Sequence, residues 1–126
     1  MQRQRLFGTN GVRGVWGKEL TADLVIDLTY AIATHFGSGS IVVGYDGRRS
    51  SPVVAKLVRS AVNSAGLDVA DAGMLPTPCL QYAAKGTDYH GGIMITASHS
   101  PPEYNGIKPA AADGVELSRE GELEVE

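Results

Sequence analysis

Short runs of apolar, often β-branched residues alternate along this chain with longer amphipathic segments, and this alternation strongly limits the folds it can adopt. The runs typical of buried strands cover residues 41–46, 67–73 and 91–97. A helix that connects two neighbouring strands of one sheet makes those strands parallel. The pattern therefore predicts an α/β fold with three layers, in which a mostly parallel mixed sheet is flanked by helices.

Three segments are predicted helices because their apolar residues recur about every three to four positions. They cover residues 21–36, 51–65 and 75–86. Thr21, Ser51 and Thr77 are the predicted caps, and the last two are followed by a proline, which suits the first helical turn. Gly37 and Gly66 follow the first two helices and are natural stops.

The C-terminal part is predicted to add an antiparallel edge to the sheet. Residues 106–110 and 114–117 are short strand-like runs that can pair as a hairpin across the turn between them. Ser118 is placed to begin a last helix. The sequence contains no linker or internal repeat, so its 126 residues are predicted to form one domain.

The composition supports a folded domain and excludes several functions. Hydrophobic residues make up 43% of the chain, which is enough for a core. The net charge of −3 gives no reason to expect binding to nucleic acid or to a membrane surface. Cys79 is the single cysteine, and the sequence shows neither a signal peptide nor a membrane helix. We therefore expect a cytoplasmic protein without an internal disulfide.

Three loops are predicted at the carboxyl ends of the strands, where ligands bind in open α/β sheets. They cover residues 46–50, 73–78 and 98–105. Most of the polar residues that need an explanation lie in these loops. The sequence therefore predicts a binding or catalytic site at this end of the sheet.

Ser98 directly follows a predicted buried strand and is a candidate nucleophile. Pro101 and Pro102 stiffen the turn after it, and an Asn-Gly pair beginning at Asn105 tightens the return. Lys108 follows in the next strand, so the loop can bring it close to Ser98. An exposed serine held in a rigid turn suits nucleophilic chemistry, although an ordinary turn serine has the same local sequence.

A serine hydrolase is a poor match to this loop. The G-x-S-x-G motif is absent around Ser98. His99 is adjacent in sequence and would point away from Ser98, so it is better interpreted as a ligand contact or loop hydrogen bonder than as a general base. His35 and His90 have no partners at metal-ligand spacing and are interpreted as structural or surface residues.

Two more segments combine glycine with charge. Residues 7–14, "FGTNGVRG", contain Arg13 and could bind phosphate, but they match neither the P-loop nor the dinucleotide motif, and a purely structural glycine loop is about equally consistent. Residues 45–52, "YDGRRSSP", place Asp46 and Arg48 before a helix. We favour a capped turn with an Asp–Arg pair there, and the functional alternative is that the pair orients a neighbouring catalytic loop.

Taken together, four segments resemble one family, the α-D-phosphohexomutases, which include phosphomannomutase, phosphoglucomutase and phosphoglucosamine mutase. "FGTNGVRG" resembles the opening loop of the family, "DGRRSS" its D-x-R-x-S segment and "GMLPTP" its G-x-x-P-T-P segment. "TASHSPPEYNGIK" is similar to the phosphoserine loop, usually T-A-S-H-N-P-x-x-x-N-G-x-K. The order also matches, and the resemblance covers nearly the whole chain. Ser100 is a departure, since the family usually has asparagine there.

The resemblance implies a mechanism. Ser98 would carry a phosphoryl group and transfer it to a hexose phosphate, and the bisphosphorylated sugar would return its other phosphate to Ser98. The net reaction moves phosphate between C1 and C6. Lys108 would be the general acid/base, assisted by Arg13, and His99 would lie on the substrate side of the loop.

The resemblance also implies supporting residues and a metal. Substrate would be bound by Thr9, Asn10, Ser100 and Asn105, and the site would be supported by Asp46 and Arg48. Mg²⁺ would bind in the full-length enzyme through phosphorylated Ser98. The aspartate-rich metal loop of the family is absent from these residues, so the chain alone is expected not to hold the metal tightly.

Family members have four domains, so residues 1–126 are expected to be domain I, the phosphoserine domain, of a longer enzyme and to be inactive in isolation. The expected partners are a hexose phosphate and the remaining domains of the same polypeptide. The alternative function is a non-catalytic module that binds or senses sugar phosphate, motivated by Ser100 and the short chain. The sequence does not choose between mannose, glucose and glucosamine phosphates.

Overall fold

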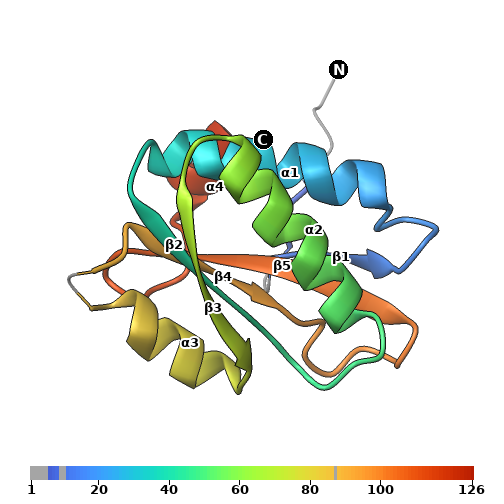
Figure 1. The fold of residues 1–126 in the computed structure, drawn as a ribbon. Coiled ribbons are helices and arrows are strands. Elements are labelled where there is room, and N and C mark those ends of the chain that lie inside the picture. The colour runs from blue at the N-terminus through green and yellow to red at the C-terminus, as the bar shows by residue number, and fades with distance from the viewer. Residues whose placement is uncertain (1–5, 9–10, 87) are drawn as a thin grey trace.

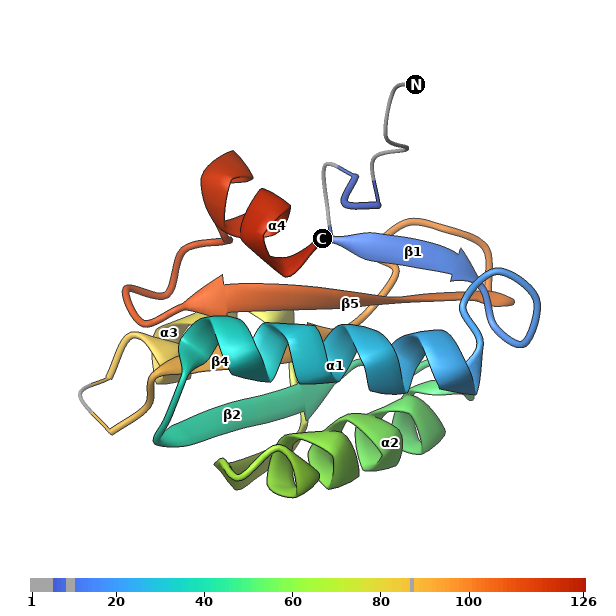
Figure 2. The same cartoon turned by 90° about the horizontal axis from the view of Figure 1, so that it is seen from above.

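The structure is a computed structural model that describes residues 6–8, 11–86 and 88–126. Within these residues, a five-stranded sheet has helices on both faces (Figures 1 and 2). In chain order the elements are β1 (Val12–Val15), α1 (Ala22–Phe36), β2 (Ser40–Tyr45), α2 (Ser51–Ser64), β3 (Asp68–Met74), α3 (Thr77–Ala84), β4 (Gly91–Ile95), β5 (Tyr104–Ala111) and α4 (Arg119–Val125). The predicted α/β fold is confirmed.

The sheet is mixed, with the strand order β1-β5-β4-β2-β3. β2 is parallel to both β3 and β4, whereas β5 is antiparallel to β4 and β1 is antiparallel to β5. The predicted antiparallel side is therefore present, but its outermost strand comes from the N-terminal part of the chain. In the described part of the chain, the predicted hairpin of residues 106–110 with 114–117 is reduced to an isolated bridge between Ala110 and Glu116.

β1 is the strand that the sequence did not predict. It has only four residues, too few to show the alternation of apolar and polar side chains on which strand prediction depends. Val12 is buried in the core, whereas Arg13 is exposed. Gly14 is needed for packing, since a Cβ atom there would lie 2.7 Å from the Cβ of Glu19. The segment "FGTNGVRG" is thus partly a strand at the edge of the sheet.

The helix ends agree with the sequence in part. Thr21 caps α1 as predicted, and its Oγ1 accepts the N–H of Leu24 at 3.2 Å. The prediction for α2 was wrong, because Ser51 is its first residue and Ser50 is the cap. The prediction for α3 was wrong in the same way, since Pro76 stands at the cap position in place of Thr77.

Both faces of the sheet are buried. On one face α1 and α2 pack against the sheet (Figure 2), and fully buried side chains there include Val25, Ile32, Val54, Ile93 and Ile107. On the other face α3 covers a smaller cluster, formed by Val42, Leu80, Ala84, Met94 and Ala110. Burial on both sides explains why β2 and β4 are almost entirely apolar. No helix among the described residues is long and apolar enough to cross a bilayer.

Glu126 ties the end of α4 to the N-terminal segment. Its Oε1 accepts the backbone N–H groups of Phe7 at 3.0 Å and Leu6 at 3.2 Å, and it lies 3.2 Å from Nη1 of Arg119. The hydrogen bond from Phe7, followed by the contact with Arg119, holds the pKa of the Glu126 carboxyl below its usual range, although burial acts in the opposite direction. The charged form of Glu126 is therefore favoured by folding.

The change Glu126→Gln is expected to lower the melting temperature at neutral pH and to have less effect in acid. A carboxyl with a depressed pKa stabilises the folded state above its ordinary pKa of 4.5, and this contribution is lost as the pH falls through the pKa of the folded state. Thermal unfolding of both proteins across a pH series measures the effect. Glu120→Gln, at an exposed position of the same helix, is the control. A difference between the two proteins that is the same at neutral and acidic pH would contradict the prediction.

Candidate active site

The loops that follow β2 and β4 meet at one end of the sheet because these strands are parallel neighbours. Polar residues predicted to be functional lie in these loops, at residues 46–50 and 96–103. The loop after β3 lies next to them, and the N–H of Leu75 donates to the carbonyl of Tyr45 at 3.0 Å. The three predicted loops therefore gather at the carboxyl end of the parallel strands.

Ser98 is exposed and has an unusual backbone conformation. Its φ angle is 54°, and it is the one non-glycine residue with positive φ among those the structure describes. This conformation costs roughly 1–2 kcal/mol for a residue with a Cβ atom. Strained backbone persists where neighbouring contacts enforce it, and such positions cluster at functional sites. The exposed, strained serine makes this loop the candidate active site.

Arg48 binds the Ser98 loop through its backbone carbonyl groups. Its Nη2 donates to the carbonyls of Ser98 at 2.9 Å and Ser100 at 2.8 Å. Its Nη1 donates to those of Pro101 at 2.7 Å and Tyr104 at 3.2 Å. The guanidinium has its donors in a fixed planar arrangement, so one side chain can hold four carbonyls of a folded-back loop.

Asp46 accepts hydrogen bonds from its own loop, from the start of α2 and from the residue that follows β4. Its Oδ2 accepts from Nε of Arg48 at 3.2 Å, and its Oδ1 accepts the Arg48 N–H at 3.1 Å. Oδ1 also accepts the Ser51 hydroxyl at 2.5 Å, and Oδ2 accepts the Thr96 hydroxyl at 2.7 Å. The Asp–Arg pair favoured by the sequence is present. The same pair contacts the neighbouring serine loop, so the two interpretations of this segment are compatible.

Asn105 lies beneath the loop and is fully buried. Its Nδ2 donates to the hydroxyls of Ser50 at 2.7 Å and Ser51 at 3.0 Å, while its Oδ1 accepts the N–H of Gly106 at 2.8 Å. The predicted contact with substrate does not fit a side chain that has no exposed surface. In this structure Asn105 supports the junction between the loop and the start of α2.

Arg13 reaches the serine loop from β1. Its partner in β5 is Gly106, and a Cβ atom at Gly106 would lie 2.6 Å from Cγ of Arg13, so the side chain passes over this glycine. Nη1 of Arg13 donates to the carbonyl of Ala97 and to Oγ of Ser100, both at 3.1 Å. Ser100, the departure from the family pattern, thus accepts a hydrogen bond from the predicted catalytic arginine.

Lys108 lies two positions after Gly106 in β5, which places it on the same face of the sheet as Arg13. Its Nζ lies 2.8 Å from Oε1 of Glu116, and its side chain is mostly buried. The sequence did not identify Glu116 as a partner. The turn of residues 111–114 was the available signal, since it returns the chain along the strand that contains Lys108.

The remaining predicted site residues are less well defined by contacts. His99 is exposed next to Ser98, and its place on the substrate side of the loop stays a prediction. Thr9 and Asn10 lie outside the described residues. Among the residues that are described, no group of three or more His, Cys, Asp and Glu side chains could hold a metal ion, and His35 and His90 belong to no such group.

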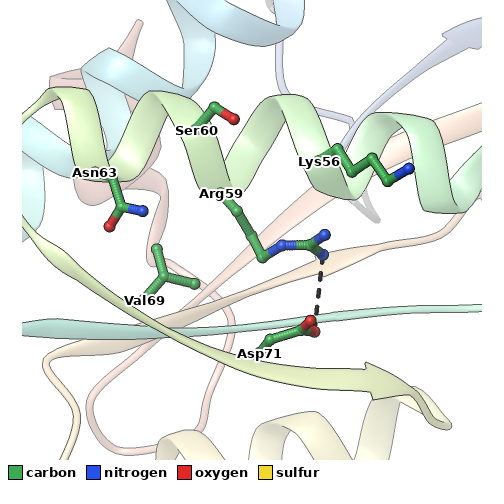
Figure 3. Close-up of a pocket in the computed structure, with 6 residues that line it drawn as sticks. All are labelled: Lys56, Arg59, Ser60, Asn63, Val69 and Asp71. Carbon is green, nitrogen blue, oxygen red and sulfur yellow. Dashed lines mark ion pairs between the residues drawn. The ribbon is translucent and has the colours of Figure 1, made fainter.

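The surface has a hollow of about 340 Å³ beside the loop, lined by Asp46, Gly47, Arg48, Ser100 and Pro102. A second groove of about 450 Å³ lies between α2 and β3 (Figure 3), lined by Lys56, Arg59, Ser60, Asn63, Val69 and Asp71. In that groove Arg59 is directed at Asp71, with 3.7 Å between Nη1 and Oδ1. No residue of the serine loop contributes to the second groove, so the first hollow is the one linked to the candidate active site.

One protein family accounts for nearly the whole chain. The family model for phosphoglucomutase/phosphomannomutase, alpha/beta/alpha domain I, matches residues 4–126. The chain belongs to the phosphoglucomutase/phosphomannomutase family. The predicted resemblance is confirmed, and the fold of this chain is that of domain I of the family.

Similar proteins in this family include sugar-phosphate mutases. The phosphoglucosamine/phosphogalactosamine mutase of Sulfurisphaera tokodaii is 52% identical over 123 residues, which are 97% of this chain and 27% of that protein. The phosphoglucosamine mutase of Gloeothece citriformis is 44% identical over 90% of this chain and 24% of that protein. The chain thus spans about a quarter of the length of these relatives.

Solved structures of the phosphoglucomutase/phosphomannomutase family have the same fold. A protein from Thermus thermophilus gives a TM-score of 0.90 at 35% identity, over 99% of this chain and 30% of that one. A phosphoglucomutase/phosphomannomutase family protein from Burkholderia thailandensis gives a TM-score of 0.83 at 30% identity, again over 99% of this chain and 30% of the other.

Proposed function

We propose that this chain is the phosphoserine domain of a phosphohexomutase that moves phosphate between C1 and C6 of an amino sugar. The observation that carries the proposal is Ser98, which is exposed, strained and held by Arg48 in the loop that resembles the family's phosphoserine loop. The amino-sugar substrate is proposed because relatives at 52% and 44% identity are named as mutases of glucosamine phosphate.

In the first proposed step, Ser98 carries a phosphoryl group on Oγ. The free hydroxyl of the sugar phosphate attacks phosphorus, a new O–P bond forms to the sugar, and the O–P bond to Ser98 breaks. Lys108, acting in its neutral form, takes the proton of the attacking hydroxyl and then donates it to Oγ of Ser98, so the lysine ends the step as it began. The bisphosphorylated sugar then turns over and returns its other phosphoryl group to Ser98 by the same chemistry.

Phosphoryl transfer depends mainly on positioning and on neutralising negative charge. Arg13 brings positive charge to this loop, because its Nη1 donates to the carbonyl of Ala97, the residue before Ser98, and to Oγ of Ser100, both at 3.1 Å. Lys108 lies on the same face of the sheet and is now paired with Glu116. Mg²⁺ would be held in the full-length enzyme through phosphorylated Ser98 together with ligands from other domains, and it would neutralise negative charge on the transferred phosphoryl group.

The direct test is to supply the full-length polypeptide with glucosamine 6-phosphate and a trace of the bisphosphorylated sugar, and to follow the 1-phosphate by ³¹P NMR. We expect interconversion of the two monophosphates and phosphate bound to Ser98 by mass spectrometry. Mannose and glucose phosphates, tested in parallel, report the sugar preference. The 126-residue chain alone is expected to be inactive, because it spans about a quarter of the related mutases.

The alternative function, a sugar-phosphate sensor, predicts a different result from the same samples. A sensor would bind the sugar phosphate, as measured by calorimetry, while no phosphate is transferred to Ser98 or between sugar positions. Binding without transfer in the full-length polypeptide would therefore reject the mutase and favour the sensor.

A further inference from the structure

Thr96 is a polar residue buried at the end of β4, between the strand and the serine loop. Its relative exposure is 8%, compared with the exposed Ser98 two residues later. The sequence motifs assign it no role of its own. A buried hydroxyl needs hydrogen-bond partners, because burying it without them is unfavourable.

Thr96 has partners in both directions. Its hydroxyl donates to Oδ2 of Asp46 at 2.7 Å, and its Oγ1 accepts the backbone N–H of Ser98 at 3.1 Å. A hydroxyl has one donor and two acceptor positions, so a single Thr96 side chain can make both bonds at once. The Asp46 carboxylate, at one end of this series of hydrogen bonds, is fixed in turn by Ser51 and Arg48.

This series of hydrogen bonds ends at the backbone N–H of Ser98. The φ angle of 54° is unfavourable for serine, so some contact must stabilise it. Arg48 binds carbonyl groups of the loop, including that of Ser98, but it makes no bond to the Ser98 N–H. The N–H is directed into the protein toward Thr96, while the side chain of Ser98 is exposed.

We propose that Thr96 is a positioning residue. It connects the fixed carboxylate of Asp46 to the backbone N–H of Ser98, and it thereby sets the direction of the nucleophilic hydroxyl. The inference rests on the proposed function, because the hydroxyl needs a fixed direction only if it carries and transfers phosphate. In-line phosphoryl transfer is sensitive to displacement, and a shift of about 1 Å can lower a rate by about 100-fold.

The test compares Thr96→Val with Thr96→Ser in the full-length polypeptide. Valine preserves the shape of the side chain but neither donates to Asp46 nor accepts from Ser98, whereas serine keeps both bonds. We expect Thr96→Val to lower kcat by about 10- to 100-fold with KM within about threefold, and Thr96→Ser to stay within about threefold of the original in both. Thr34→Val changes an exposed threonine of α1 and is the matched control.

Hydrogen exchange of the Ser98 amide gives a readout that does not depend on catalysis. We expect this amide to be protected in the original protein and in Thr96→Ser, and to exchange faster in Thr96→Val. A Ser98 amide that is unprotected in the original protein would overturn the inference, even if Thr96→Val does not fold. Equal loss of kcat in the serine and valine variants would also overturn it, because the hydroxyl would not be the responsible group.

The two proposals fail in different ways. If the original full-length polypeptide transfers no phosphate, the mutase function fails, whatever the exchange data show. If it is an active mutase and Thr96→Val retains both its kcat and the slow exchange at Ser98, the positioning role of Thr96 fails and the mutase function stands.

Discussion

Replacing Ser98 with alanine in the full-length polypeptide is expected to lower mutase activity by about 1000-fold or more, with no phosphate bound to the protein. The reason is that Oγ of Ser98 is the only atom of this side chain that can form the phosphoryl bond. The fold should be unaffected, because the side chain is exposed and alanine has the same backbone strain as serine at a φ angle of 54°.

The measurements for Ser98→Ala are the rate of glucosamine 6-phosphate conversion, the mass of the protein and its melting temperature. Ser60→Ala is a suitable control, since Ser60 is an exposed serine on α2 at a distance from the serine loop in sequence and in the fold. Mutase activity in Ser98→Ala equal to that of the control would remove Ser98 from the mechanism. If Ser98→Ala loses activity and its melting temperature also falls well below that of the control, the loss would come from misfolding and not from the missing nucleophile.

Local features of this site were accessible from the sequence because the interacting residues are close together in the chain. Asp46 and Arg48 are two residues apart, and the Asp–Arg pair expected between them is present. A rigid turn after Ser98 was likewise predicted, and Pro101 and Pro102 lie in that loop, but the predicted Asn-Gly turn was wrong, because Asn105 and Gly106 belong to strand β5. Such contacts depend on turn chemistry, which short stretches of sequence encode directly.

Contacts between segments that are distant in the sequence could not be predicted in the same way. Arg13 meets Ser100 because β1 pairs with β5 in one particular register, and a strand of four residues shows no periodicity from which that register can be read. The pairing of Lys108 with Glu116 likewise depends on how the chain returns after β5. A shift of one residue in register would turn such side chains to the opposite face of the sheet.

Ser51 shows how tertiary structure overrides a local rule. A serine before a proline is a reasonable helix cap, and the sequence predicted that role. In the structure its hydroxyl donates to Asp46 instead, and it also accepts from Asn105. A half-buried carboxylate is stabilised by several donors, and Ser51 lies where it can supply one to Asp46. Ser51 therefore serves the site, and α2 begins without a side-chain cap at Ser50.

Removing the guanidinium in Arg48→Met is expected to reduce both stability and activity. The side chain is 13% exposed, and it donates to four loop carbonyls while it pairs with Asp46. Losing one partner of a largely buried ion pair costs about 3 kcal/mol or more, and the carbonyls also lose their donors. We expect a fall of about this size in the free energy of unfolding, measured in urea, together with a loss of mutase activity.

Two further variants separate the charge of Arg48 from its geometry. Arg48→Lys keeps a positive charge near Asp46, but an ammonium group lacks the planar fork that reaches several carbonyls at once, so we expect most of the stability loss to remain. Arg49→Met removes the same side chain at an exposed neighbouring position and should change little. If Arg48→Met is as stable and as active as Arg49→Met, the loop must be held without the arginine. The strained backbone of Ser98 would then be held by the bond from its amide to Thr96 and by the turn bond from the Ser100 N–H to the Ala97 carbonyl at 3.0 Å.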